Sequence, residues 1–176
     1  MGGMGYTKGS PTIEEEVLLA VLSWIRPYLA VGPRPDSAVW DLLVREKVSL
    51  VIDLNDDVSE GRMAVRFGLD YRGLKVPDPT GVVEFLAGFP SVGGWISAER
   101  VSGGRVYLHC TAGVYRSPTF AMAYLMMIGE PRDRAIQIVR AAHPLSWSSG
   151  DEDTLHRALR LWEEKLRLGP ESLRPV

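Results

Sequence analysis

A cysteine and an arginine separated by five residues form the most reactive pattern in this 176-residue chain, Cys110 and Arg116. A short apolar segment typical of a buried strand precedes the cysteine, and an apolar, helix-prone segment, residues 118–127, follows the arginine. Main-chain N–H groups in a tight turn and at a helix N-terminus attract anions, and their field also favours a thiolate. An arginine fork can bind two oxygens of one phosphate group. The pattern predicts a loop that binds a tetrahedral dianion beside a nucleophilic cysteine.

Three other interpretations of the loop stay open at this point. Cys110 can be an ordinary buried thiol, which is the commonest role of a lone cysteine. The loop can also bind phosphate without turnover, as an interaction module. A sulfur transferase or an arsenate reductase can use a similar anion cradle.

The run from His109 to Thr119, HCTAGVYRSPT, resembles the active-site signature of cysteine-dependent protein phosphatases. It is most similar to the dual-specificity branch, whose members often continue with Ala-Tyr-Leu-Met, as residues 123–126 do here. Residues 26–32 resemble the first strand of that family, and residues 48–55 resemble its early buried strand. The resemblance extends over about residues 25–142. It implies a phosphatase that needs no metal ion and no cofactor.

The resemblance also implies a proton donor on a loop upstream of the cysteine. Asp78 lies in the run Val-Pro-Asp-Pro-Thr, 32 positions before Cys110, which is the spacing usual in dual-specificity phosphatases. The flanking prolines prevent this segment from continuing as a strand or a helix. Asp78 can instead cap the helix that follows, a common role of aspartate. Asp70 is the second candidate for the acid.

The mechanism implied by the family has two steps. The Cys110 thiolate attacks phosphorus while Asp78 protonates the leaving oxygen, and water then hydrolyses the phosphocysteine with Asp78 as the base. Ser117 is expected to donate a hydrogen bond to the sulfur, and His109 to face away from substrate and orient the loop. The phosphate oxygens are expected to be held by the Arg116 guanidinium and by the backbone amides of Thr111, Ala112, Gly113, Val114, Tyr115 and Arg116.

Residues 143–151 occupy the place where some tyrosine-specific relatives position the hydrolytic water with a glutamine. Here the one glutamine is Gln137, in a helix-like segment, where a solvent-facing position is expected. Ser146, Trp147 or Ser148 can line the pocket, and Trp147 can instead anchor the core.

Alternating strand-like and helix-like segments predict an α/β fold, with a mostly parallel central sheet and helices on both faces. Residues 1–11 are expected to be a flexible tail, and residues 12–176 a single catalytic domain. A capping box at residues 12–15 predicts an N-terminal helical extension that ends near Trp24. Glycines and Pro90 predict a broken helical region between residue 82 and Gly103-Gly104.

The other predicted helices are 36–47, 59–67, 117–128, 132–142 and 151–168, and the other predicted strands are 49–54 and 71–76. In the last helix, Leu155, Leu159, Trp162 and Leu166 follow a helical spacing, which indicates core packing.

Composition limits the partners. The net charge of −2 provides no basic field for nucleic acid, and no apolar run reaches the ~20 residues that span a bilayer. A single cysteine excludes an intrachain disulfide and favours a reducing, cytoplasmic location. We expect a monomer that acts on a phosphoprotein or phosphopeptide, with phosphotyrosine preferred and phosphoserine or phosphothreonine left open. Inositol-lipid phosphatases of related design place lysines where Thr111 and Val114 stand here, which argues against a lipid. RNA 5′-phosphate remains an alternative substrate.

Overall fold

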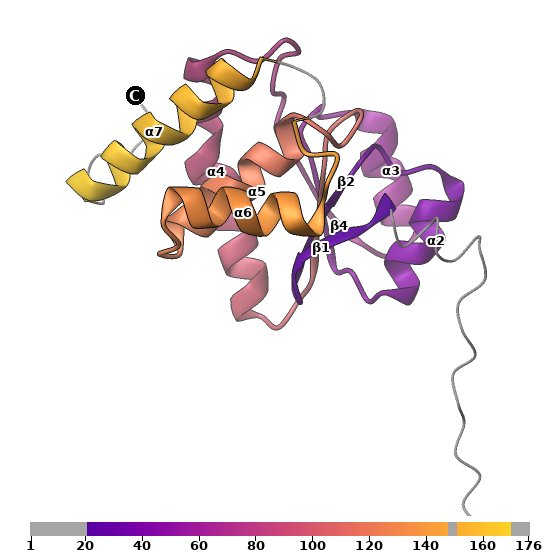
Figure 1. Cartoon of the computed structure of the whole chain (residues 1–176). Helices are drawn as coiled ribbons and strands as arrows, with labels where there is room; N and C mark the ends of the chain where they lie inside the picture. Colours follow the sequence, from indigo (N-terminus) through magenta and orange to yellow (C-terminus); the bar gives the residue numbers. More distant parts are fainter. Residues whose placement is uncertain (1–20, 148–150, 170–176) are drawn as a thin grey trace, which may run out of the picture.

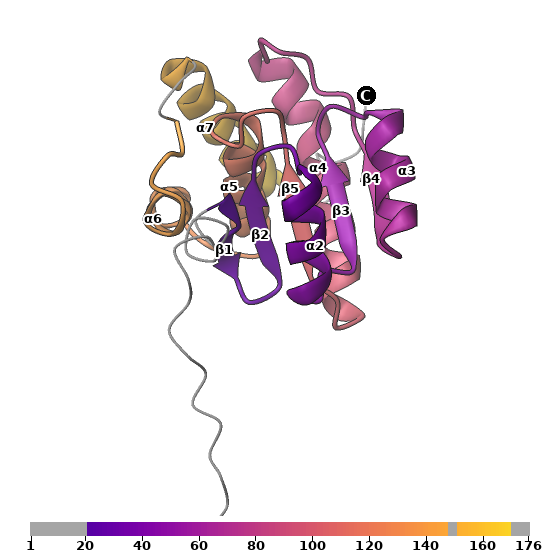
Figure 2. The same ribbon diagram turned by 90° about the vertical axis from the view of Figure 1, so that its right-hand side faces the viewer.

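A five-stranded sheet with the strand order β1-β2-β5-β3-β4 organises the computed structural model, which describes residues 21–147 and 151–169 (Figures 1 and 2). The first pair of strands is antiparallel, and every other pair is parallel. The strands are β1 (Ser23–Arg26), β2 (Leu29–Gly32), β3 (Leu50–Asp53), β4 (Asp70–Gly73) and β5 (Val106–His109). The helices are α2 (Ser37–Arg45), α3 (Val58–Arg66), α4 (Val82–Val101), α5 (Arg116–Met127), α6 (Arg132–Ala142) and α7 (Glu152–Leu168).

Helices cover both faces of the sheet, so the central strands β3 and β5 are buried on both sides. Side chains alternate along each strand, so Tyr107 of β5 points to one core whereas Val106 and Leu108 point to the other. Residues of α2 and α3, such as Trp40 and Ala64, pack in the first core. The helices α4, α5, α6 and α7 close the second core, on the opposite side of the sheet in Figure 1. The predicted α/β class is confirmed.

The helix α4 corrects the prediction of a broken helical region. It is one helix of 20 residues with Pro90 inside it. A Cβ atom at Gly88 would lie 2.8 Å from the Phe120 ring, and one at Gly93 would lie 2.8 Å from Met127. The glycines therefore allow α4 and α5 to approach closely, and the buried apolar residues of α4 hold the helix together across the proline.

The start of the described chain also differs from the prediction. Most of the helix predicted from residue 12 lies outside the described residues, but Ser23 and Trp24, its expected end, belong to β1. There they pair with Val31 and Ala30 of β2. The segment forms an edge strand because this pairing satisfies its main-chain groups, which local helix signals cannot anticipate. Residues 26–32, predicted as one strand, contain the turn between β1 and β2.

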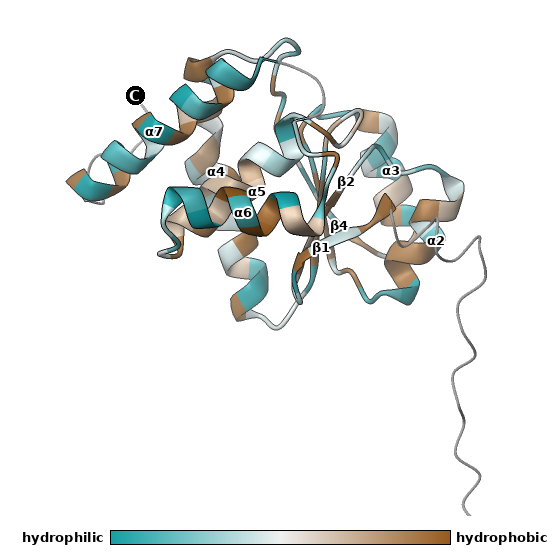
Figure 3. Cartoon of the chain, in the orientation of Figure 1, coloured by the Kyte–Doolittle hydropathy of each residue, from teal (hydrophilic) through white to brown (hydrophobic). Residues whose placement is uncertain are grey.

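The remaining elements confirm the predicted order, with boundaries that differ by a few residues. Asp36 caps α2 by accepting a hydrogen bond from the Val39 amide, and Asp151 caps α7 in the same manner. Figure 3 shows that α6 and α7 carry both hydrophilic and hydrophobic residues, as expected of helices with one face in the core. In the part of the chain that the structure describes, no helix has the length and apolar character needed to cross a membrane.

The predicted apolar stripe of α7 packs against the core. Leu155 and Leu159 are 0% exposed, Trp162 is 1% exposed, and Leu166 packs partly buried beside them. The Trp162 indole also donates a hydrogen bond to the Ala123 carbonyl of α5 at 3.0 Å. The stripe therefore joins α7 to α5, the helix that follows Cys110 and its loop.

We expect Leu159→Ala to lower the free energy of unfolding by about 3 kcal/mol, because it removes buried methyl groups and leaves a cavity. Leu168, in the last turn of the same helix, is 78% exposed. The matched change Leu168→Ala should alter stability by less than about 0.5 kcal/mol. Urea unfolding of both variants measures the difference. Equal effects would show that α7 is not part of the cooperative core.

Candidate active site

The loop from Cys110 to Tyr115 lies at the carboxyl end of β5, the middle strand of the sheet. Arg116 is the first residue of α5, and no side chain caps the N-terminus of this helix. The first backbone N–H groups of a helix have no partner within the helix, so this terminus can bind an anion. Open α/β sheets commonly bind ligands at the carboxyl ends of their strands.

Four carbonyl groups of the loop accept hydrogen bonds from the surrounding protein. The acceptors are the carbonyls of Cys110, Thr111, Gly113 and Val114. Their donors are His109 Nδ1 at 3.2 Å, the Arg34 amide at 3.0 Å, His143 Nε2 at 3.0 Å and the Trp147 amide at 2.6 Å.

These contacts turn the peptide units of the loop in one direction. In a planar trans peptide the C=O and N–H bonds point to opposite sides. A carbonyl held against the protein therefore directs the next residue's N–H away from it, toward the cavity above the loop. The loop gains an inner surface of N–H donors, which is the arrangement that a phosphate group requires.

Gly113 is necessary for this loop conformation. Its φ of 77° lies in the left-handed region, which residues with a side chain rarely adopt. A Cβ atom there would also lie 2.5 Å from the backbone of Gly32 and Pro33. No other residue fits at this position without moving the loop or β2.

Arg116 is buried, with 3% of its surface exposed, although it carries a charge. Its Nη1 donates to the Val76 carbonyl at 2.8 Å. Its Nη2 donates to Thr111 Oγ1 at 2.9 Å and to Asp78 Oδ2 at 3.0 Å. The guanidinium is therefore fixed by backbone and side chains beside the cysteine.

Asp78 lies at the rim of the same cavity, with 63% of its side chain exposed. It does not cap α4, because the N-cap of that helix is Gly81 and no side chain caps it. Asp70, the second candidate for the acid, is exposed at the start of β4 and does not line the cavity. The carboxyl ends of the strands, not their starts, form the site.

Cys110 is buried, with 2% of its surface exposed, at the bottom of the cavity. Ser117 lies behind it, fully buried, and its Oγ is 3.5 Å from the sulfur. A hydroxyl at this distance can donate a weak hydrogen bond to a thiolate. The structure thus brings together Cys110, Arg116, Asp78 and Ser117, all four residues predicted to take part in catalysis.

The cavity has a volume of about 380 Å³, within the range of small-molecule sites. Its described lining includes five of the six loop residues expected to contact substrate, Thr111, Ala112, Val114, Tyr115 and Arg116. Gly113 supports the loop from behind and does not line the cavity. The apolar walls come from Pro79, Val114 and Tyr115.

Asp151 and Thr154, at the start of α7, are among the lining residues that the sequence analysis missed. Hydrogen bonds from the hydroxyl and amide of Thr154 lower the pKa of Asp151, so its carboxylate stays ionised at neutral pH. The Tyr115 hydroxyl donates to the Asp151 carbonyl at 3.4 Å. The sequence analysis predicted a helix over 151–168, but only the tertiary structure places the start of that helix over the loop.

Residues 143–147, after α6, support the loop instead of lining the cavity. Trp147 is a core residue, and its indole donates to Thr119 Oγ1 at 3.0 Å. The expectation that Trp147 anchors the core is confirmed. Ser146 is also buried, with its hydroxyl on the His143 carbonyl, and Ser148 lies outside the described residues. Gln137 faces solvent from α6, as expected.

His143 holds the loop from below. Its Nε2 must be the donor to Gly113, because a carbonyl can only accept. Its Nδ1 lies 2.7 Å from Ser23 Oγ, which can donate to it. Burial lowers the pKa of His143, consistent with a neutral ring that donates at one nitrogen and accepts at the other.

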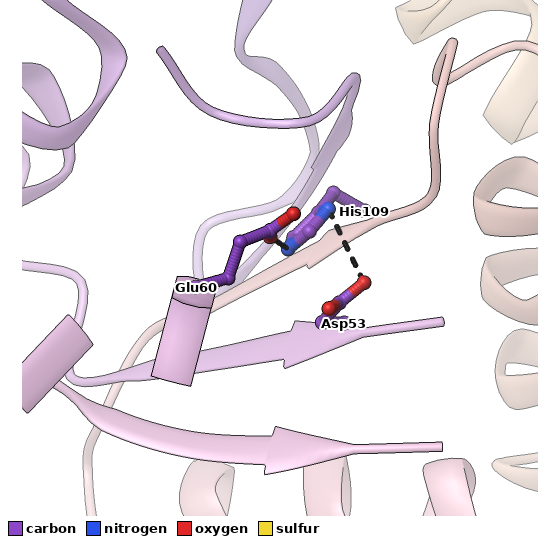
Figure 4. Close-up of side chains that lie close together, drawn as sticks. All are labelled: Asp53, Glu60 and His109. Atoms are coloured by element: carbon purple, nitrogen blue, oxygen red, sulfur yellow. Dashed lines mark ion pairs between the residues drawn. The ribbon is translucent and has the colours of Figure 1, made fainter. Parts of the chain in front are cut away.

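His109 points away from the cavity into a buried cluster with Asp53 and Glu60 (Figure 4). Its Nε2 lies 3.0 Å from Glu60 Oε2, and its Nδ1 lies 3.8 Å from Asp53 Oδ1. Arg34 pairs with the other oxygen of Glu60, and this contact raises the pKa of Arg34. The cluster holds the ring whose Nδ1 donates to the Cys110 carbonyl.

These three side chains are the one group of possible metal ligands among the described residues. Their hydrogen bonds fit a structural role better. The Asp53 oxygens already accept from the Asn55 amide and side chain, the Asp57 amide and the Tyr71 hydroxyl. Glu60 Oε1 pairs with Arg34 and Glu60 Oε2 lies 3.0 Å from His109 Nε2, so each oxygen of Glu60 already faces a nitrogen of the protein.

Comparison with known proteins agrees with this geometry. The family model described as dual specificity phosphatase, catalytic domain, matches residues 30–164. Dual specificity protein phosphatase 5 of Rattus norvegicus is 31% identical over 102 residues, which are 58% of this chain and 26% of that protein. Dual specificity protein phosphatase 19 of Mus musculus is 25% identical over 144 residues, 81% of this chain and 61% of that protein.

Solved structures share the fold. The structure of Tk-PTP in the active form has a TM-score of 0.69 and 23% identity, and the alignment covers 82% of this chain and 97% of that one. The structure of PTPMT1 in complex with PI(5)P has a TM-score of 0.72 and 22% identity, with 84% and 97% covered. The family model extends from β2 into α7 and includes the whole loop, and the chain therefore belongs to the dual specificity phosphatase catalytic-domain family.

Proposed function

We propose that the chain is a protein phosphatase that hydrolyses phosphotyrosine through a phosphocysteine intermediate. The observation that carries this proposal is a single cavity that contains a buried cysteine, a fixed arginine and an exposed aspartate at its rim. Family membership supports the same activity. The chain spans only part of its relatives' length, so this activity is a proposal for the whole protein.

In the first step, the Cys110 thiolate attacks phosphorus in line with the leaving oxygen. The S–P bond forms, the P–O ester bond breaks, and Asp78 gives its proton to the departing alkoxide or phenoxide. The loop amides and the Arg116 guanidinium stabilise the charge on the three equatorial oxygens. Apart from these donors, the step requires no other positive charge.

In the second step, water attacks phosphorus and Asp78, now ionised, accepts its proton. The S–P bond breaks, inorganic phosphate is released and the thiolate is regenerated. The Ser117 hydroxyl, 3.5 Å from the sulfur, stabilises the departing thiolate. Asp78 is exposed at the rim, so water can reach it without rearrangement of the core.

The lining of the cavity favours a substrate with one phosphate group. Arg116 is the one cation among the described lining residues, and Asp78 and Asp151 are acidic. A ligand with several phosphates would meet like charge at the rim. Although PI(5)P is bound to the similar PTPMT1, the lining of this cavity supports a phosphoprotein over a phosphoinositide or an RNA 5′ end.

We expect the wild-type chain to release phosphate from a phosphotyrosine peptide in the presence of EDTA, and Cys110→Ser to abolish this release. Hydrolysis should be slower with three other substrates assayed under the same conditions: a phosphothreonine peptide, a phosphoinositide and an RNA 5′-phosphate. Turnover that is lost with EDTA would contradict the proposed chemistry. Binding of phosphopeptide without turnover would indicate an interaction module, and turnover of the lipid or RNA alone would indicate a non-protein substrate.

Asp78→Ala should lower turnover of an alkyl phosphate by about 10²–10³-fold, because no group then protonates the leaving oxygen. The loss should be smaller for p-nitrophenyl phosphate, whose leaving group needs no proton. The bell-shaped pH profile should also lose its alkaline limb, which reflects deprotonation of the acid. Asp70→Ala is the matched control and should stay within about twofold of wild type. The opposite result, with the defect in Asp70→Ala alone, would identify Asp70 as the acid.

A further inference from the structure

A chain of side-chain hydrogen bonds runs from the end of β3 to Arg116. Asn55 Nδ2 donates to Asp53 Oδ1 at 3.0 Å, and Thr111 Oγ1 donates to Asn55 Oδ1 at 2.9 Å. Arg116 Nη2 donates to Thr111 Oγ1 at 2.9 Å. The chain thus connects a buried carboxylate below the loop with the guanidinium inside the cavity.

The direction of each bond follows from the groups at its two ends. Arginine has donors and no acceptor, so Thr111 Oγ1 must accept from Arg116 and direct its own hydrogen elsewhere. Asp53 is an acceptor, so the NH₂ group of Asn55 faces it and the amide oxygen faces Thr111. Each hydrogen therefore has one available acceptor, and the chain has one consistent arrangement.

The two side chains that accept from Arg116 Nη2, Asp78 and Thr111, differ in how firmly the rest of the protein holds them. Asp78 is 63% exposed and must exchange protons with substrate and water, so it is a poor anchor. The Thr111 hydroxyl is held by Asn55, and Asn55 is held by Asp53, which is 0% exposed and accepts four hydrogen bonds. An anion that enters the cavity can displace Asp78 from the guanidinium and leave this second contact in place.

We propose that Thr111 and Asn55 are positioning residues that hold the Arg116 guanidinium for phosphate. The role of Thr111 in this proposal belongs to its side chain and is separate from the expected contact of its backbone amide with substrate. The proposal rests on the proposed function, because it concerns the same phosphate site. It adds Asn55, which lies outside the cysteine loop and outside the set of residues that line the cavity.

Thr111→Val tests the bridge, because valine keeps the shape of threonine and removes the hydroxyl. We expect about a tenfold weaker inhibition by inorganic phosphate and about a tenfold lower kcat/KM for p-nitrophenyl phosphate, the effect of one hydrogen bond to a charged group. Thr111→Ser keeps the hydroxyl, so its phosphate inhibition and its kcat/KM should both be close to those of the wild type. Asn55→Ala should resemble Thr111→Val. The melting temperatures should stay close to wild type.

The double variant Asn55→Ala with Thr111→Val provides the sharper test. If Asn55 acts on Arg116 only through Thr111, the double variant should bind phosphate as well as the more impaired of the two single variants. Either single change already breaks the bridge, so the second change has no further effect. Additive losses would show that they act independently and would overturn the proposal. Equal losses of phosphate affinity in Thr111→Val and Thr111→Ser would also overturn the proposal, because they would indicate a steric cause.

The phosphate measurement separates this proposal from the proposed function. Binding of inorganic phosphate to each variant, measured by calorimetry, requires no turnover. If the wild type binds phosphate but hydrolyses no substrate, the proposed function fails while the affinity series still tests the bridge. If hydrolysis is normal and phosphate affinity does not depend on the Thr111 hydroxyl, the bridge fails and the proposed function stands.

Discussion

The site depends on the outward anchoring of the loop carbonyls. A six-residue loop between a strand and a helix has no regular hydrogen bonds of its own, so its peptide units can rotate. Here donors from the end of β5, the segment after β2 and the segment after α6 hold four carbonyls against the protein, and the opposing N–H groups are left for an anion. The cavity is therefore prepared before substrate arrives, which lowers the cost of binding a dianion.

Arg116 adds the one fixed cation among the described residues that line the cavity. Burying a guanidinium is unfavourable unless its donors are satisfied. The Val76 carbonyl, the Thr111 hydroxyl and Asp78 accept hydrogen bonds from its two terminal nitrogens in the structure. The contact with Asp78 also connects the proposed acid to the arginine, so the residues proposed for both chemical steps lie together at one end of the sheet.

A layer of buried polar groups below the loop supports this arrangement. Asp53 and Glu60 are almost fully buried, yet each is paired with donors, and His109 lies between them (Figure 4). Hydrogen bonds from the Asp57 amide and the Tyr71 hydroxyl fix Asp53, whereas Glu60 Oε2 and His109 Nε2 lie 3.0 Å apart without a well-aligned hydrogen bond. The Arg34 side chain pairs with Glu60 while its backbone amide holds the Thr111 carbonyl, so a single residue joins the network to the loop.

Much of the site could be predicted from the sequence because its chemistry is local. The spacing of Cys110 and Arg116, the glycine between them and the helix that follows define an anion-binding turn within a few residues. The role of Asp78 was predicted from its spacing and from the resemblance to a family, and the cavity confirms its location. The helix α5 was predicted from an apolar, helix-prone segment and α7 from apolar residues at helical spacing, and these signals also act over short distances.

Long-range packing decided the rest. Pairing with β2 makes Ser23 and Trp24 a strand, although local signals favoured a helix. Contact with α5 allows α4 to continue through Pro90, because its glycines permit close approach. The supports of the loop, His143, Trp147 and Glu60, carry no motif, since their roles depend on atoms that are 30 or more residues away in sequence. The sequence by itself determined which residues could do the chemistry, and the tertiary structure decided what holds them, because those hydrogen bonds exist only after the strands and helices have packed.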